Sequence, residues 1–296
     1  MRLAGARNMN GGDSRLDTEY PSVAYVPPIG RAVGSERHIY AVNSNENTYT
    51  NDWTGPYYGF FMLEHTLRNT DAPRRLKAFN LYYHMYSGER SAALASVRHF
   101  LDMARRQPVA PIAASHYVTI AEDFFSVEIE QVNLSAWAVT RRGAVQTVRF
   151  DDADGLGVDW AQSIGVIGFT RHQRSLYVTL DPQVSRAIIA LRAGADPDRR
   201  DAATPPLVLD GSRWQVRGIS QPAAGGPCEL TATVEGFGPG DMTWRAPPGK
   251  RVSAVLRRAG ETIAASTARA RADGLVDLRL EASAIEPLSL GLSCHD

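Results

Sequence analysis

The N-terminal part of the chain alternates the patterns of strands and helices. Short apolar runs bounded by turn residues predict strands, and longer runs with apolar residues at helical spacing predict helices. Strands and helices in alternation are typical of a parallel α/β layer or barrel. The predicted strands are residues 21–26, 38–42 and 79–83, and the predicted helices are 57–69, 87–107 (with the apolar stripe Leu94, Val97, Leu101 and Ala104) and 114–125.

The pattern changes near residue 131. From there, short alternating strands are separated by turns rich in Gly, Pro and Asp, which indicates a β-sandwich. Two pairs of strands flank polar turns and predict hairpins, namely 133–140 with 144–150 around Arg141-Arg142-Gly143, and 164–169 with 175–180. Further predicted strands are 214–219, 228–234, 251–257, 262–268 and 275–280, and residues 193–206 read as a loop or linker inside this half.

These patterns predict a chain of two parts. We expect an α/β region at residues 1–128 and an all-β accessory domain at residues 131–296. The pattern leaves open whether the all-β part is one sandwich or two small ones.

Composition narrows the possible partners. The 296-residue chain has 32 basic and 32 acidic residues, so its charge favours neither nucleic acid nor an anionic membrane as partner. No apolar run approaches the roughly 20 residues that span a bilayer. Residues 1–7 lack the apolar core of a signal peptide, which by itself argues for a cytosolic chain. Cys228 and Cys294 either pair as a disulfide in an oxidising compartment or are two small buried side chains.

The richest candidate chemistry lies in residues 43–60. This run holds two carboxylates, four asparagines and five aromatic rings, and it follows neither a helical nor a strand period. Aromatic faces edged by amides and carboxylates suit a sugar, which is apolar on one face and hydroxylated at its rim. The predicted sugar-contacting residues in the run are Asn45, Asn47, Tyr49, Asn51, Trp53, Tyr57 and Tyr58.

His84 is the leading catalytic candidate. It stands where the predicted strand 79–83 gives way to a Ser-Gly loop, and catalytic groups in α/β layers and barrels cluster at the carboxyl ends of strands. Its titration range suits a general acid near neutral pH. Tyr83 and Tyr86 flank it and are predicted to line the same site. The alternative is a core histidine that is hydrogen-bonded to a backbone carbonyl.

Two acidic residues in the polar-aromatic run are further candidates. Glu46 and Asp52 could act as acid, base or metal ligand, and Asp52 precedes a tryptophan that could stack on a sugar. The alternative is a solvated loop in which Asp52 caps the helix predicted from Tyr57. Near the N-terminus, Asn10-Gly-Gly-Asp13 could let the backbone approach a ligand closely, or could be a plain turn. The chain has no HxxxH, HExxH or CxxC motif, so it contains no readable metal site.

Three of these segments together resemble a known family. They are Asn10-Gly-Gly-Asp13, then Asn45-Glu-Asn-x-Tyr-Thr-Asn-x-Trp-x-Gly-Pro-x-Tyr-Gly59, and then Tyr82-Tyr-His84-x-Tyr86. The combination, over roughly residues 8 to 130, is similar to the C-terminal part of the Pel exopolysaccharide deacetylases. Those are periplasmic multidomain enzymes that remove acetyl groups from an N-acetylgalactosamine-containing biofilm polymer. The resemblance implies a distorted, here partial, β/α barrel at residues 1–128, followed by the β-sandwich.

The resemblance also implies roles for individual residues. In such enzymes a divalent, zinc-like metal polarises the acetamide carbonyl, an aspartate acts as base, and a late histidine protonates the departing amine. His84 matches that histidine, and residues 43–60 would line the sugar site. The implied ligand is an amino-sugar polysaccharide, and the implied location is periplasmic or otherwise extracytoplasmic.

The sequence departs from the family pattern at its start. The Asp-Asp pair and the HxxxH-type pair, which supply base and metal ligands, do not occur before Asn10, and Asp151-Asp152 reads as a turn. We therefore expect a truncated or split barrel that is inactive alone. Its unpaired strand edges would need a partner, such as the missing N-terminal part or another exopolysaccharide-export protein.

Two other functions stay open at this point. The first is a carbohydrate-binding or assembly module that keeps the polar-aromatic run without turnover. The second is a metal-independent glycoside hydrolase that uses Glu46 and Asp52 as its carboxylate pair.

Overall fold

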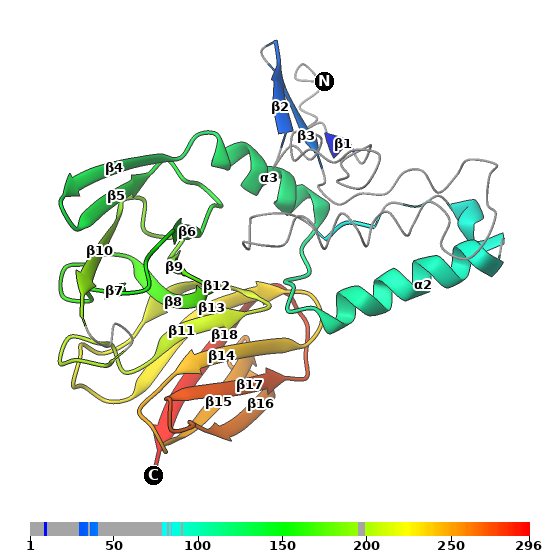
Figure 1. Cartoon of the computed structure of the whole chain (residues 1–296). Coiled ribbons are helices and arrows are strands. Elements are labelled where there is room, and N and C mark those ends of the chain that lie inside the picture. The colour runs from blue at the N-terminus through cyan, green and yellow to red at the C-terminus, as the bar shows by residue number, and fades with distance from the viewer. Residues whose placement is uncertain are drawn as a thin grey trace. The chain divides into compact units, whose positions relative to one another are not determined.

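The computed structural model describes residues 9–10, 30–34, 36–40, 79–81, 83, 85–89, 91–194 and 199–296 (Figure 1). The chain forms two compact units. Unit 1 comprises Met1–Val109 with Ala114–Glu122, and unit 2 comprises Ala110–Ala113 with Asp123–Asp296. The boundary expected from the sequence, at 128–131, lies a few residues after this division. No helix among the described residues combines the length and apolar character that crossing a membrane requires.

Unit 1 contains a small sheet with a helix against it. Strand β3 (Glu36–Tyr40) pairs in parallel with β1 (Met9–Asn10) and antiparallel with β2 (Gly30–Val33). Ile39 of β3 is fully buried in a cluster with Tyr117, Val118 and Ala121 of helix α3 (Ala114–Phe124).

Two of the predictions for unit 1 are confirmed by these elements. They are the helix at 114–125, and the strand at 38–42 over its described residues. The strand predicted at 21–26 and the helix predicted at 57–69 lie outside the described residues. The described elements do not form a barrel.

The second helix of unit 1 is α2 (Ser91–Arg106), which follows a short 3₁₀ turn, η4 (Met85–Glu89). It ends just before Gln107-Pro108, as the proline signal predicts. Its buried residues are Ala93, Ser96, Val97 and Phe100. The predicted stripe is therefore partly wrong: Val97 is buried, but Leu101 is 42% exposed because the buried face is turned toward Ala93 and Phe100.

The strand predicted at residues 79–83 is wrong for the residues that the structure describes. Phe79, Asn80, Leu81 and Tyr83 have no regular secondary structure. A strand needs a neighbour to complete its backbone hydrogen bonds. Leu81 instead packs against Val97 and Phe100 of α2, so its apolar character serves a contact with the helix.

Unit 2 is built of β-sheets, as the sequence predicts. Its strands form three sheets, named in the following sentences in spatial order. The four-stranded sheet is β4 (Glu128–Asn133), β5 (Ala136–Thr140), β10 (Ala187–Ala193) and β7 (Leu156–Val158). The six-stranded sheet is β17 (Leu275–Leu280), β14 (Gly240–Arg245), β11 (Val208–Ser212), β8 (Val166–His172), β9 (Ser175–Leu180) and β6 (Thr147–Phe150). The five-stranded sheet is β12 (Gln215–Ser220), β13 (Glu229–Gly236), β18 (Ala284–His295), β15 (Arg251–Arg258) and β16 (Glu261–Arg269).

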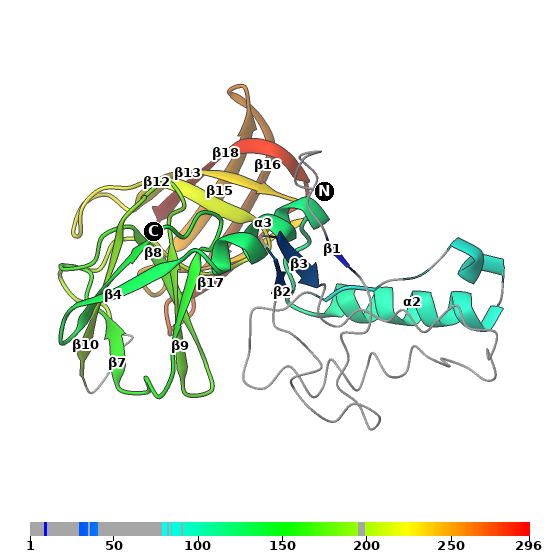
Figure 2. The ribbon, with the colours of Figure 1, turned by 90° about the horizontal axis from the view of Figure 1, so that it is seen from above.

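The six-stranded sheet is shared between two cores. One core joins β11, β14 and β17 to the five-stranded sheet, around the fully buried Trp244. The other joins β8 and β9 to β5, β7 and β10 of the four-stranded sheet. Strand β11 serves both, because Leu209 lies in the first core and its neighbour Val208 in the second. Figure 2 shows β12, β13, β15, β16 and β18 grouped apart from β4, β7 and β10. The β-rich part is thus two sandwich-like layers with one sheet in common.

Of the two predicted hairpins, one is confirmed and one is wrong. Strands β8 and β9 pair across a tight turn, which is closed by the pair of His172 with Ser175. Strands β5 and β6 both exist, but β5 pairs with β4 and β10, and β6 pairs with β9.

The reason for the wrong hairpin is the side chain of Arg142. It is only 3% exposed, and its guanidinium donates hydrogen bonds to the carbonyl oxygens of Val145 (3.0 Å), Val184 (2.7 Å) and Asp181. The segment that reads as a hairpin turn is therefore tied to the end of β9. It carries the chain from one sheet to the other.

The later predicted strands are confirmed, and the structure adds strands that the sequence did not indicate. The predictions at 214–219, 228–234, 251–257, 262–268 and 275–280 correspond to β12, β13, β15, β16 and β17. Asp151-Asp152 lies in a bend, as expected, with Asp152 at a φ of 51°. The added strands are β4, β7, β10, β11, β14 and β18.

Candidate functional site

Most of the site residues predicted from the sequence lie outside the described residues. Of the rest, the structure describes Tyr83 with its side chain, which is 42% exposed, and the backbone of Asn10 in β1 and of Tyr86 in η4. The predicted site is therefore not assembled by the described part of the chain. The predicted residues outside it are Asp13, Asn45, Glu46, Asn47, Tyr49, Asn51, Asp52, Trp53, Tyr57, Tyr58 and His84.

The metal implied by the resemblance has no ligand set in the described ranges. Within them, no group of three or more His, Cys, Asp or Glu side chains could hold a metal ion. We therefore derive no chemical step from a metal.

The structure offers a different candidate, a groove on the open face of the five-stranded sheet. Its volume is about 490 Å³. Its floor follows one register row, in which Ser220, Thr231, Gly291 and Val255 lie side by side on β12, β13, β18 and β15. The neighbours of these residues along each strand point into the core, so this row faces outward. We call this feature the sheet groove.

Gly291 makes the floor of the sheet groove low. A Cβ atom at this position would lie 3.3 Å from Nη1 of Arg257, so the guanidinium of Arg257 lies across the glycine. A glycine inside a strand often marks such a close approach. Arg257 makes no hydrogen bond or ion pair with any residue that the structure describes. The sheet groove thus holds an exposed cation without a described partner.

A carboxylate lines the same groove. Glu229 on β13 is exposed and pairs in register with Ser293 on β18, one row from Gly291. Its side chain has no hydrogen bond or ion pair with another described residue. Ser293 Oγ lies 3.1 Å from Nε2 of His295, and the hydroxyl of Thr231 lines the floor. Carboxylate, guanidinium and hydroxyl groups are therefore all available to a polar ligand.

The wall of the sheet groove is the segment 220–222, which a buried carboxylate holds in place. Asp181 is 5% exposed and accepts hydrogen bonds from the backbone N–H groups of Gln183, Gly218 and Ile219, each at 3.0 Å. Gly218 has a φ of 60°, which suits glycine and accompanies the bulge between Arg217 and Ser220. Because Asp181 is fully engaged by the backbone, we interpret it as an anchor for β12 and not as a reactive group.

Arg142 completes this anchor from the other side. It binds the carbonyl oxygens of Asp181 and Val184, and burial lowers the pKa of its guanidinium, while the negative charge of Asp181 opposes that shift. Its Nε is buried without a hydrogen-bond partner among the described residues. A cavity of about 390 Å³, lined by Asp181, Val184, Ser220 and Gln221 among others, lies beside the wall.

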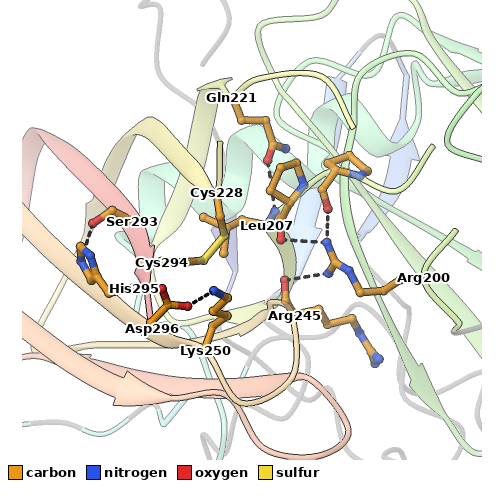
Figure 3. The surroundings of a disulfide bond; sticks show 12 residues. Arg200, Leu207, Gln221, Cys228, Arg245, Lys250, Ser293, Cys294, His295 and Asp296 are labelled. Atoms are coloured by element: carbon orange, nitrogen blue, oxygen red, sulfur yellow. Dashed lines mark hydrogen bonds and ion pairs between the residues drawn. A yellow bond between two sulfur atoms is a disulfide. The ribbon is translucent and has the colours of Figure 1, made fainter. Parts of the chain in front are cut away.

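A disulfide fixes one end of the sheet groove. Cys228 and Cys294 are bonded, with their Cα atoms 5.3 Å apart, and the N–H of Cys294 donates to the carbonyl of Cys228 at 2.8 Å (Figure 3). Cys228 directly precedes Glu229, and Cys294 directly follows Ser293. The bond thus holds the row that carries the carboxylate. Of the two alternatives left by the sequence, the structure has the disulfide.

The remaining polar contacts near the disulfide are structural. Arg200 donates to the carbonyl oxygens of Arg245 (3.4 Å), Pro206 (2.8 Å) and Pro205, and the amide oxygen of Gln221 accepts the N–H of Leu207 at 3.4 Å (Figure 3). Burial lowers the pKa of Arg200, and the nearby charge of Arg245 lowers it further. These contacts tie the chain before β11 to the wall of the sheet groove.

The charges on the outer face of β14 and β17 behave differently from those in the sheet groove. There Asp241 pairs with Arg213 (3.3 Å) and Arg279 (3.2 Å), and Asp277 pairs with Arg271. A hydrogen bond from Thr243 (2.7 Å), together with Arg271, lowers the pKa of Asp277. This face neutralises its own charges, so we interpret it as a solvated structural surface. The contrast singles out Arg257 and Glu229.

Comparison with known proteins found no match among protein-family models and none among curated protein sequences.

Proposed function

We propose that the chain belongs to the lineage of polysaccharide deacetylases and binds an N-acetylated amino-sugar exopolysaccharide of the kind found in biofilms. The observation that carries the proposal is the combination of three segments, Asn10 to Asp13, Asn45 to Gly59 and Tyr82 to Tyr86. In this proposal residues 45–58 contact the sugar, because aromatic rings cover its apolar face and amides meet its hydroxyl groups.

The catalytic part of the proposal rests on His84. As the general acid, it would donate a proton to the departing amine nitrogen when the acetamide bond breaks. Glu46 and Asp52 are the carboxylates that could orient it or the sugar. The family's metal supplies activation of the carbonyl group and of water when it is bound. We assign that metal no ligand in this chain.

The proposed location is periplasmic or extracytoplasmic. The disulfide between Cys228 and Cys294 supports this, because disulfides persist in oxidising compartments and are rare in the cytosol. An exported polymer would be met in the same compartment.

A second function, glycan binding without turnover, is favoured by the sheet groove. It lies on an open sheet face and offers hydroxyl, carboxylate and guanidinium groups. Such a surface can hold a polymer without changing it.

Two measurements on the full chain test the proposal. The first is the affinity for a partly N-acetylated galactosamine oligomer. We expect Trp53→Ala to weaken it at least tenfold, through the lost ring contact, and His84→Ala to leave it nearly unchanged. Absence of any binding by the wild-type chain would contradict the proposal.

The second measurement is acetate release from a partly acetylated hexosamine polymer, with and without added Zn²⁺. We expect none from this chain alone, since the Asp-Asp and HxxxH motifs of the family do not occur in their places in its sequence. Metal-dependent release that His84→Ala abolishes would show that binding without turnover is wrong.

A further inference from the structure

We propose that the sheet groove binds a partly deacetylated stretch of the amino-sugar polymer, with Glu229 taking an ammonium group and Arg257 taking acetamide and hydroxyl oxygen atoms. The identity of the polymer rests on the proposed function, whereas the location of the site rests on the groove alone.

The first argument is the unused charge. Glu229 and Arg257 line one groove, yet neither has a hydrogen bond or ion pair with another described residue. On the face of β14 and β17, charges of the same kinds pair within 3.3 Å, as Arg213 and Arg279 do with Asp241. Unlike charges that can reach each other generally do pair at a surface, although the gain is small. A ligand is therefore the natural partner for the two that do not.

The register keeps these two charges apart. Glu229 lies one strand and one row from Gly291, over which the guanidinium of Arg257 lies. With strands about 4.8 Å apart and about 6.8 Å between alternate residues of one strand, the two positions are about 8 Å apart. This spacing is too wide for an ion pair and comparable with a pyranose ring and its substituents.

The chemistry of the groove matches such a sugar. A deacetylated residue carries an ammonium group, which donates charge-assisted hydrogen bonds to a carboxylate. An acetylated residue carries a carbonyl oxygen, which accepts from a guanidinium. The hydroxyl groups of Thr231 and Ser293 can donate to ring hydroxyl oxygens or accept from their hydrogen atoms.

Other polymers fit the groove less well. Its lining residues include no aromatic ring, whereas single-stranded nucleic acid binds by stacking its bases on such rings. A polyanion would meet the carboxylate of Glu229 at the floor. A polymer that bears both cationic and neutral amide groups satisfies both charged residues.

The experiment uses the full chain and three galactosamine oligomers of equal length, which are fully acetylated, half acetylated and fully deacetylated. We expect the half-acetylated oligomer to bind most tightly. Glu229→Gln should weaken binding of the deacetylated oligomer about tenfold and leave the acetylated one nearly unchanged, and Arg257→Ala should do the reverse.

Two further variants control for folding and location. Arg279→Ala removes an arginine from the opposite, self-neutralised face and should change no affinity. Gly291→Leu fills the floor beneath Arg257 and should weaken all three oligomers. Each variant is first shown to unfold at the wild-type temperature within a few degrees, so that a lost affinity reports the groove.

The outcomes separate the two proposals. If the wild-type chain binds and Trp53→Ala weakens binding while Glu229→Gln and Arg257→Ala do not, the sheet-groove site is wrong and the proposed function stands. If the groove variants weaken binding of a neutral glucan but no amino-sugar oligomer binds, the amino-sugar assignment is wrong. If the wild-type chain binds no saccharide, both proposals are wrong.

Discussion

Breaking the disulfide between Cys228 and Cys294 should destabilise unit 2 strongly. The bond links two residues that are 66 positions apart in the sequence. In the folded state β13 and β18 already hold these residues side by side through their ladder, from Glu229 with Ser293 onward. Reduction therefore leaves the folded contacts in place and mainly frees the unfolded chain.

The size of the effect follows from the length of the closed loop. A loop of about 66 residues corresponds to about 4 kcal/mol of unfolding free energy at 25 °C in the chain-entropy description. For a unit of this size, each kcal/mol shifts the melting temperature by roughly 2–4 °C. Reduction should thus lower the melting temperature of unit 2 by roughly 8–16 °C.

The assay is thermal unfolding of the full chain, followed by near-ultraviolet circular dichroism, with and without a reducing agent. The Cys228→Ser, Cys294→Ser double variant should melt near the reduced wild-type chain in either condition. Equal melting temperatures for the oxidised and reduced wild-type chain would refute the reasoning, because they would mean that the bond does not restrict the unfolded state.

Three further predictions concern the core, the anchor and the ionised surface. Trp244→Ala, at a fully buried ring, should cost about 3–5 kcal/mol of unfolding free energy in denaturant titrations. Arg142→Ala should cost about 3 kcal/mol in the same assay because it leaves three carbonyl groups without their donor, and a cost below about 0.5 kcal/mol would contradict its anchoring role. The folded pKa of Asp277 lies below its unfolded value, so its contribution is present above the unfolded pKa and is lost as the pH falls through the folded pKa. Thr243→Val should raise the Asp277 pKa in an NMR titration, and an unchanged pKa would show that the hydrogen bond has no such effect.

Local patterns predicted the elements that depend on local sequence. Helix α2 ends before Gln107-Pro108, and β8 and β9 form their hairpin, because proline and turn residues act within a few positions. Strand β10 was missed since its residues are mostly buried on both faces, so it shows no alternation. Strand β18 was missed because it contains Pro287 and Gly291, which usually mark the end of a strand.

Pairing partners depend on contacts that a local pattern does not contain. The sheet that takes up β6 is decided with the help of Arg142, whose hydrogen-bond acceptors at Asp181 and Val184 are about 40 residues away. The sheet groove likewise combines Glu229, Arg257 and Gly291 from three strands, and only their register brings them together. A glycine inside an alternating strand was the one sequence signal that could have indicated it.

The most direct test of the central claim is a titration of the full chain with a half-acetylated galactosamine oligomer and with a neutral glucan of equal length. The account predicts that the amino-sugar oligomer binds at least tenfold more tightly than the glucan, and that Trp53→Ala removes most of this preference. Equal affinity for the two polymers, or a preference that Trp53→Ala leaves intact, would contradict it.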